Sequence, residues 1–126
     1  MEFPYTRLHA YQSAAAFVVC VDVIAAALPR GRAYLVDQLR RAATSVQANI
    51  AEGAGEFSPP DKARFYRIAL RSATECGSLL DTCQNLKLCN ADALYEARVL
   101  LDRVIGMTTR LVQRFGYPPG EGSGNR

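Results

Sequence analysis

The sequence lacks several features on which common enzyme activities depend. It has no tryptophan, a single histidine, His9, and four cysteines that form no C-x-x-C pair. These residues do not make a zinc-binding set. No G-K-S or G-K-T triplet marks a phosphate-binding loop, and no Glu-x-x-His pair marks a di-iron site. We therefore expect no catalytic residue, no metal site and no cofactor, in a protein that is not an enzyme.

Long apolar runs are also missing. The most apolar stretch, Ala14 to Leu28, has fifteen residues with Asp22 in its middle, whereas a membrane-spanning helix needs about twenty apolar residues. We predict no membrane span. No signal peptide with a basic start is visible, and we expect a cytoplasmic protein whose cysteines act as small buried hydrophobes. The stretch is still apolar on nearly every side, so we expect another copy of the chain to cover it.

The composition that is present is ordinary for one globular domain. The chain has 126 residues, 49% hydrophobic and 21% charged, with a net charge of only +3, which suits a single folded domain. Its fifteen basic residues include only two lysines, Lys62 and Lys87. Arginine's planar fork of donors suits phosphate and carboxylate groups, so the bias favours contacts with phosphates or proteins. A GC-rich genome would produce the same bias.

Proline and glycine divide the chain into four predicted helices. They run from about Arg7 to Leu28, Arg32 to Ala54, Pro59 to Leu88, and from after Asn90 to Phe115. Ser58 and Asp61 form a capping-box pattern, Asn90 is an N-cap, and Gly116 is a left-handed stop.

Apolar residues recur at three- and four-residue steps in these segments, and no run alternates with period two. In the third helix this spacing predicts a buried seam of Phe65, Ile68, Ser72, Cys76, Leu79, Cys83 and Leu86. We predict an all-α fold, an antiparallel up-down-up-down four-helix bundle over residues 1–116 that assembles as a ring-like homo-oligomer. Residues 117–126 have the composition of a flexible C-terminal tail.

A polar stripe accompanies the apolar seam of the second helix. Gln38, Arg41, Ser45, Asn49 and Glu52 follow three- and four-residue steps. Such a stripe fits a buried hydrogen-bond network that fixes helix pairing, or a site for a small polar ligand or phosphate. As members of the network we predict Gln38, Ser45, Asn49, Glu52, Ser72 and Glu75.

Arginines form further stripes, and these are the candidate nucleic-acid contacts. The candidates are Arg40, Arg41, Arg64, Arg67, Arg71, Arg103, Arg110 and Arg114. A charge stripe also fits a merely solvated helix face. Repeated around a ring, however, the stripes would become basic bands, and phosphate binding grows with the number of charges engaged. Asp22, among apolar residues, is expected to pair with Arg103 or Arg110.

The stretch QLRRAATSVQANIAEGAGE, residues 38–56, resembles the signature of a known family. This family consists of four-helix bundle proteins encoded in intervening sequences of bacterial large-subunit ribosomal RNA genes, and its pattern is roughly Q-L-R-R-A-A-x-S-I-x-x-N-I-A-E-G-x-G-R. The matching residues are Gln38, Leu39, Arg40, Arg41, Ala42, Ala43, Ser45, Asn49, Ile50, Ala51, Glu52, Gly53 and Gly55. The flanks agree from about Tyr5 to Phe115, whereas Glu56 stands where the family often has a basic residue.

The resemblance implies more about assembly than about activity. The family is similar in fold to the accessory variability determinant of diversity-generating retroelements, a ring of five four-helix bundles. That protein associates with a reverse transcriptase and with nucleic acid. By resemblance we expect a homopentamer, with RNA, DNA or a reverse-transcriptase-like protein as partner. The alternative is a scaffold protein whose basic residues are used in salt bridges.

Overall fold

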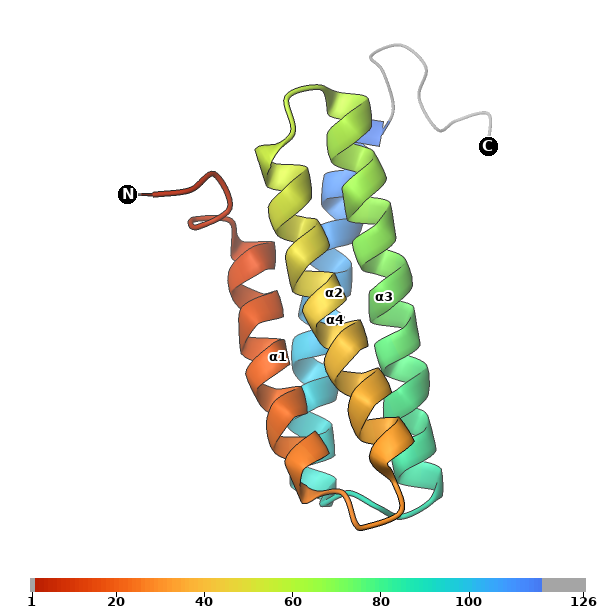
Figure 1. Ribbon diagram of the computed structural model, residues 1–126. Helices are drawn as coiled ribbons and strands as arrows, with labels where there is room; N and C mark the ends of the chain where they lie inside the picture. The colour runs from red at the N-terminus through yellow and green to blue at the C-terminus, as the bar shows by residue number, and fades with distance from the viewer. Residues whose placement is uncertain (1, 117–126) are drawn as a thin grey trace.

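The computed structural model describes residues 2–116, and within this range the secondary structure is four α-helices with no β-strand. They are α1 (His9–Ala27), α2 (Ala33–Gly55), α3 (Pro59–Asn85) and α4 (Ala91–Gly116). The helices lie side by side, and their connections are at alternating ends of the molecule (Figure 1). The all-α prediction is confirmed. The tail predicted for residues 117–126 lies outside the described residues.

Helix α3 begins where the sequence predicts and ends earlier. The Ser58 hydroxyl accepts the backbone N–H of Asp61 at 3.2 Å, with proline in the first turn. At the other end Lys87 adopts a left-handed φ of 57°. The N–H of Leu88 then bonds the carbonyl of Cys83 at 2.9 Å, and that of Lys87 bonds Gln84 at 3.0 Å. This pair of bonds is a Schellman turn, which ends the helix before the predicted Leu88.

Helix α4 also differs from its prediction at one end. Asn90 caps it as expected, since its Oδ1 accepts the N–H groups of Asp92 and Ala93 at 2.8 and 3.2 Å. Gly116, predicted as a left-handed stop after Phe115, is instead the last helical residue. A β-carbon at Gly116 would lie 2.7 Å from Nη2 of Arg67. The glycine therefore leaves room for an arginine that crosses the end of α4.

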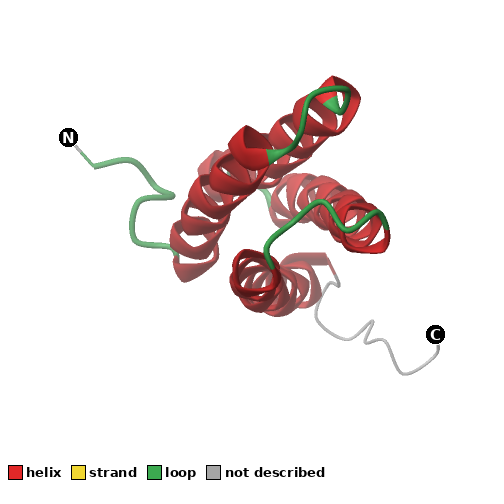
Figure 2. Cartoon of the chain, turned by 90° about the horizontal axis from the view of Figure 1, so that it is seen from below, coloured by secondary structure: helices red, strands yellow, loops and turns green. Residues whose placement is uncertain are grey.

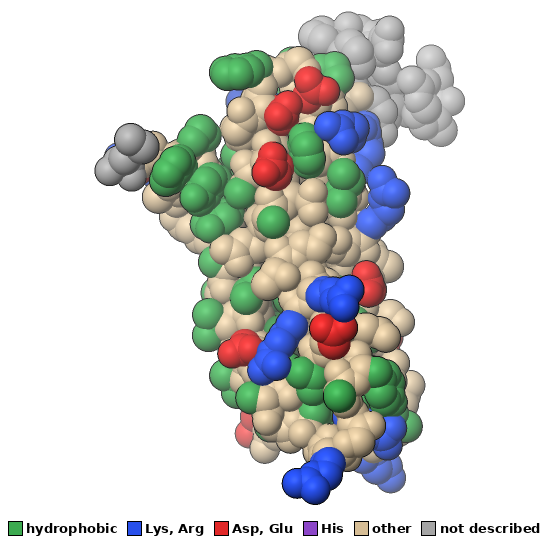
Figure 3. Space-filling model, in the orientation of Figure 1, with side chains coloured by type: hydrophobic (Ala, Val, Ile, Leu, Met, Phe, Trp, Pro, Cys, Tyr) green, Lys and Arg blue, Asp and Glu red, His purple; other side chains and the backbone are tan. Residues whose placement is uncertain are grey.

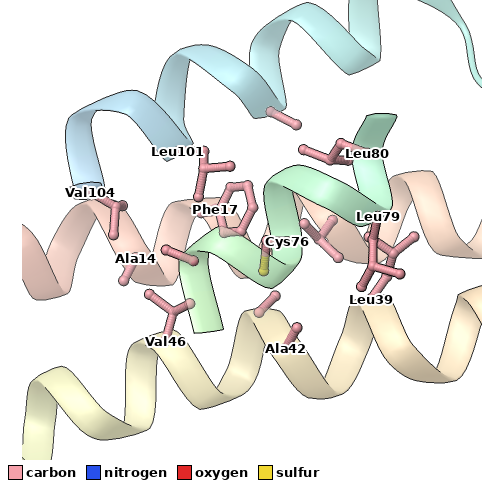
Figure 4. Close-up of a cluster of buried hydrophobic side chains, with 14 of the residues drawn as sticks. Ala14, Phe17, Leu39, Ala42, Val46, Cys76, Leu79, Leu80, Leu101 and Val104 are labelled. Atoms are coloured by element: carbon pink, nitrogen blue, oxygen red, sulfur yellow. The ribbon is translucent and has the colours of Figure 1, made fainter. Parts of the chain in front are cut away.

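The bundle has one core, to which all four helices contribute. Helices α2 and α4 each pack against both α1 and α3, so α1 and α3 occupy opposite corners (Figure 2). Phe17 of α1, Leu39 of α2, Leu80 of α3 and Val104 of α4 are completely buried. In the close-up, core side chains from these helices point toward one another (Figure 4).

The predicted α3 seam is wrong at both ends. The buried residues in its first half are Ala63, Tyr66, Ala69 and Ala73, whereas Phe65, Ile68 and Ser72 are half-buried at the flank. Small alanines face the core here because they allow α2 and α3 to approach closely. Larger side chains at the border then cover the contact. Leu86, beyond the end of the helix, is 43% exposed.

Helix α1 keeps a wide apolar face outside the core. Phe17, Val21 and Ile24 are buried, but Val19 is 66% and Val23 62% exposed. The helix is long and apolar enough to cross a membrane, with 19 residues and a mean hydropathy of 1.7. Core helices of soluble proteins pass the same test. The outer face of α1 is therefore apolar, and Val19 and Val23 on it are not covered by the rest of the described chain.

Candidate nucleic-acid interface

Two of the candidate arginines are held in ion pairs. Nε of Arg40 lies 2.9 Å from Oδ1 of Asp22, which joins α2 to α1. Nη2 of Arg41 lies 2.8 Å from Oδ2 of Asp37, one helical turn earlier on α2. The prediction that Asp22 pairs with Arg103 or Arg110 is wrong, because this side of α1 faces α2. Both pairs are exposed and weak in water, but each carboxylate lowers the local positive charge that an outside anion would meet.

The other six candidates have no such partner. They are Arg64, Arg67, Arg71, Arg103, Arg110 and Arg114, all exposed. Within residues 2–116 none of them has a carboxylate within 4.0 Å. The Arg64 guanidinium lies 4.4 Å from the centre of the Phe65 ring, and that of Arg114 lies 5.1 Å from the Phe115 ring. Their charges are therefore open to a polyanion.

The six arginines fall on separate surfaces. Arg64, Arg67 and Arg71 form the α3 arginine row, on successive turns of one helix face. Figure 3 shows basic side chains along the edge formed by the first half of α3. Arg103 lines a small hollow of about 230 Å³ with Tyr95, Glu96, Val99 and Leu100. The predicted α4 stripe is thus divided, because Arg110 and Arg114 belong to another cavity.

That cavity, the α1–α4 groove, lies where α1 begins and α4 ends. It has a volume of about 400 Å³ and is lined by Arg7, Leu8, His9, Ala10, Met107, Arg110, Leu111 and Arg114. Sequence reasoning missed Arg7 and His9 as members of a basic surface. The signal was indirect, since only the antiparallel pairing of the first and last helices brings residues a hundred positions apart together.

The predicted polar network forms only in part. Oγ of Ser45 and Oγ of Ser72 lie 2.8 Å apart and join α2 to α3. Nδ2 of Asn49 donates to the carbonyl of Ser45 at 2.8 Å and to its Oγ at 3.1 Å. All three residues are half-buried, so the network fixes the register of the two helices. The other predicted members, Gln38, Glu52 and Glu75, are exposed and take no part in these hydrogen bonds.

The glycine of the motif has a packing role that sequence reasoning missed. Gly53 is buried, and a β-carbon there would lie 2.6 Å from Cε1 of Tyr66. Burial raises the pKa of Tyr66. Nζ of Lys62 donates to the carbonyls of Gly53 and Ala54 at 3.3 and 3.0 Å. These bonds give hydrogen-bond partners to carbonyl groups at the end of α2. The glycine of the motif thus reflects a close crossing of α2 and α3, not a phosphate-binding turn.

The cysteines are free thiols, and two of them lie in the core. Cys76 and Cys83 are buried, while Cys20 and Cys89 are half-buried. Burial raises the pKa of Cys76 to about 12 and that of Cys83 to about 11. Such thiols are protonated near neutral pH and are poor nucleophiles or metal ligands. Among the described residues, no group of three His, Cys, Asp or Glu could hold a metal ion.

Fold and surface together define a small four-helix bundle protein with open arginine surfaces. The family model for the 23S rRNA-intervening sequence protein matches residues 6–110. No curated protein matches the sequence. Because the family model covers most of the chain, the chain belongs to the 23S rRNA-intervening sequence protein family. The resemblance drawn from residues 38–56 is confirmed at the level of the family.

Proposed function

We propose that the protein is a non-enzymatic homo-oligomer that binds nucleic acid through its arginines. The up-down-up-down bundle would be the repeating unit of a ring-like assembly, with five copies as the expected number. The assembly would be cytoplasmic, with no attachment to a membrane. Its partner would be RNA, DNA or a reverse-transcriptase-like protein that itself handles nucleic acid.

The observation that carries nucleic-acid binding is the set of six arginines without a carboxylate nearby in the described part of the chain. Arginine binds phosphate with a planar fork of donors, and each neutralised phosphate releases counterions. A net charge of +3 would bind weakly in a single chain. Repetition around a ring would multiply the number of phosphates that one nucleic acid can contact.

The proposed self-association is supported by the outer face of α1. A cavity of about 300 Å³ between α1 and α2 is lined largely by Val18, Val19, Val21 and Ala43, with the Asp22–Arg40 pair beside it. Val19, which lines this cavity, is 66% exposed, and Val23, one helical turn later, is 62% exposed. Exposed valines and an apolar hollow on the same helix suit a contact between copies, because such a contact removes apolar surface from water.

The number of copies and the kind of partner come from family resemblance. The family resembles the accessory variability determinant of diversity-generating retroelements, a five-membered ring that associates with a reverse transcriptase. This resemblance favours a pentamer over other closed rings. It also favours a partner that acts on nucleic acid.

Fluorescence anisotropy with short structured RNA and duplex DNA tests the proposal, at about 50 and 200 mM salt. Light scattering in the same buffers gives the mass. We expect an assembly of several chains whose affinity for nucleic acid falls steeply as the salt concentration rises. A monomer at micromolar concentration would contradict the ring.

A scaffold without nucleic-acid binding is the second candidate. It is favoured by the ion pairs Arg40–Asp22, Arg41–Asp37 and Arg98–Asp81, which use basic residues inside the chain. An assembled protein that binds no nucleic acid at about 50 mM salt would select the scaffold. The search would then turn to protein partners that bind the outer faces of α3 and α4.

A further inference from the structure

The α1–α4 groove combines two chemistries that the α3 arginine row does not. Its rim carries Arg7, His9, Arg110 and Arg114, and its floor is formed by Leu8, Met107 and Leu111. The floor side chains are half-buried and pack against the core. The groove is therefore a fixed apolar surface between basic groups, and not merely a row of solvated charges.

The rim keeps a positive charge. Nε of Arg7 lies 3.0 Å from Oε1 of Glu2, in an exposed pair that is worth little in water. Arg110 and Arg114 have no carboxylate within 4.0 Å in the described range, and the first turn of α1 contains no acidic residue. An anion entering the groove would meet at least two unneutralised guanidinium groups.

The floor determines what kind of anion fits. A bare phosphate or a rigid polyanion gains nothing from Leu8, Met107 and Leu111. A ligand with a flat apolar group next to its negative charge gains from both parts of the groove, since methionine and leucine adapt to such a surface and arginine stacks on planar groups. The volume of about 400 Å³ is within the range of small-molecule sites.

A nucleotide with an unpaired base has this combination. In a duplex the bases are stacked inside and only the phosphates face outward, so the floor of the groove would stay empty. In a single strand or loop a base can turn outward and lie on an apolar surface while its phosphates face basic groups.

We propose that the α1–α4 groove binds an unpaired nucleotide of single-stranded nucleic acid. The base lies on Leu8, Met107 and Leu111, and the neighbouring phosphates contact Arg110 and Arg114. This inference rests on the proposed function and makes it more specific. The α3 arginine row, which has no such floor, binds phosphates of single strands and duplexes alike.

Anisotropy of the full chain with a labelled single-stranded 20-mer RNA and with the duplex of the same sequence tests the inference, at about 100 mM salt. We expect the single strand to bind about fivefold more tightly per phosphate, near the lower end of the range for stacking of one base, because the floor is aliphatic. Met107→Gln keeps the side-chain length and makes the floor polar. It should remove the preference for the single strand and leave duplex affinity unchanged.

Two controls separate the floor from the charge. Leu86→Gln makes a similar change at the opposite end of the bundle, where Leu86 is 43% exposed, and should alter neither affinity. Arg64→Gln with Arg67→Gln should weaken both ligands equally. Circular dichroism must give the same helix content for every variant.

The outcomes are distinct from those of the proposed function. Equal affinity for single strand and duplex, or a preference that survives Met107→Gln, would overturn the groove assignment and leave nucleic-acid binding intact. Absence of binding to either RNA, and to the single strand and duplex of the same sequence in DNA, would overturn both. Loss of the preference in Met107→Gln alone would support the site.

Discussion

Helices α1 and α3 occupy opposite corners of the same bundle and present opposite chemistry to their surroundings. Both pack on α2 and α4. The exposed side of α1 includes Val19 and Val23, whereas the exposed side of α3 carries the α3 arginine row. The same core thus supports one face suited to an apolar partner and another suited to water or a polyanion. The difference indicates that the two faces serve different contacts.

Exposure to water also has a different free-energy cost for the two faces. Large exposed apolar patches on soluble proteins are uncommon and usually mark an interaction site. Exposed arginines need no partner, since water and counterions satisfy them. The apolar outer face of α1 therefore indicates a partner outside the single chain. The exposed arginines of the α3 arginine row do not by themselves require one.

The largest expected effect comes from making the apolar outer face of α1 charged, as the outer face of α3 is. In Val19→Glu/Val23→Glu, two exposed valines become charged. Burying a valine contributes about 1.5–3 kcal/mol, so losing both at an interface should weaken self-association by about 100-fold or more. Light scattering should then report a monomer with unchanged helix content.

The control places two glutamates on the other corner. Arg67→Glu/Arg71→Glu adds carboxylates to α3 and should leave the mass of the assembly unaltered. An α1 variant that keeps the wild-type mass would mean that another face joins the copies. Binding of wild-type protein to neutral lipid vesicles, abolished by the same two glutamates, would point to a membrane instead.

The next effect removes the charge of α3. Arg64→Ala/Arg67→Ala/Arg71→Ala should reduce the steepness of the salt dependence by about 2 in the log–log slope, because each lost phosphate contact in a single strand lowers it by about 0.7. Anisotropy over a salt series measures this slope. Arg41→Ala, whose guanidinium is paired with Asp37, should change it by much less.

The contrast between these corners could be foreseen only in part from the sequence. The apolar excess of the Ala14–Leu28 stretch is visible by composition, and so are the periodic arginines of the third helix. Helix number and the main boundaries follow from Ser58, Asn90 and the proline and glycine positions. These are local signals, which depend on a few neighbouring residues and not on how the helices pack.

Pairings between helices could not be foreseen. Asp22 meets Arg40 because α1 rotates that side toward α2, and periodicity alone does not fix this rotation. The α3 seam is displaced in its first half because small alanines allow α2 and α3 to approach closely, while Phe65 and Ile68 lie at the border of the contact. The basic rim of the α1–α4 groove depends on the first and last helices meeting, which no local pattern encodes.

A smaller effect tests how closely α2 and α3 approach each other. Gly53→Ala should lose about 1–2 kcal/mol of stability, because overpacking against the buried Tyr66 ring outweighs the gain of about 1 kcal/mol in helix propensity. Urea denaturation measures the change. Gly55→Ala has no atom within 4 Å of the new methyl group and should not destabilise. Equal behaviour of the two variants would contradict the close crossing at Gly53.

The smallest effect concerns how α1 and α3 end. Helix α1 ends at Ala27, and its C-cap residue Leu28 is extended before Pro29, without strain. Helix α3 ends at Asn85, and the Schellman turn after it holds Lys87 at a φ of 57°, which costs a non-glycine residue about 1–2 kcal/mol. Lys87→Gly should therefore stabilise the protein by about 0.5–1 kcal/mol after glycine's extra unfolded-state entropy is subtracted. Asn85→Gly, two residues earlier and still helical, should instead lose a few tenths of a kcal/mol. If thermal unfolding gave both changes the same sign, the left-handed turn at the end of α3 would be wrong.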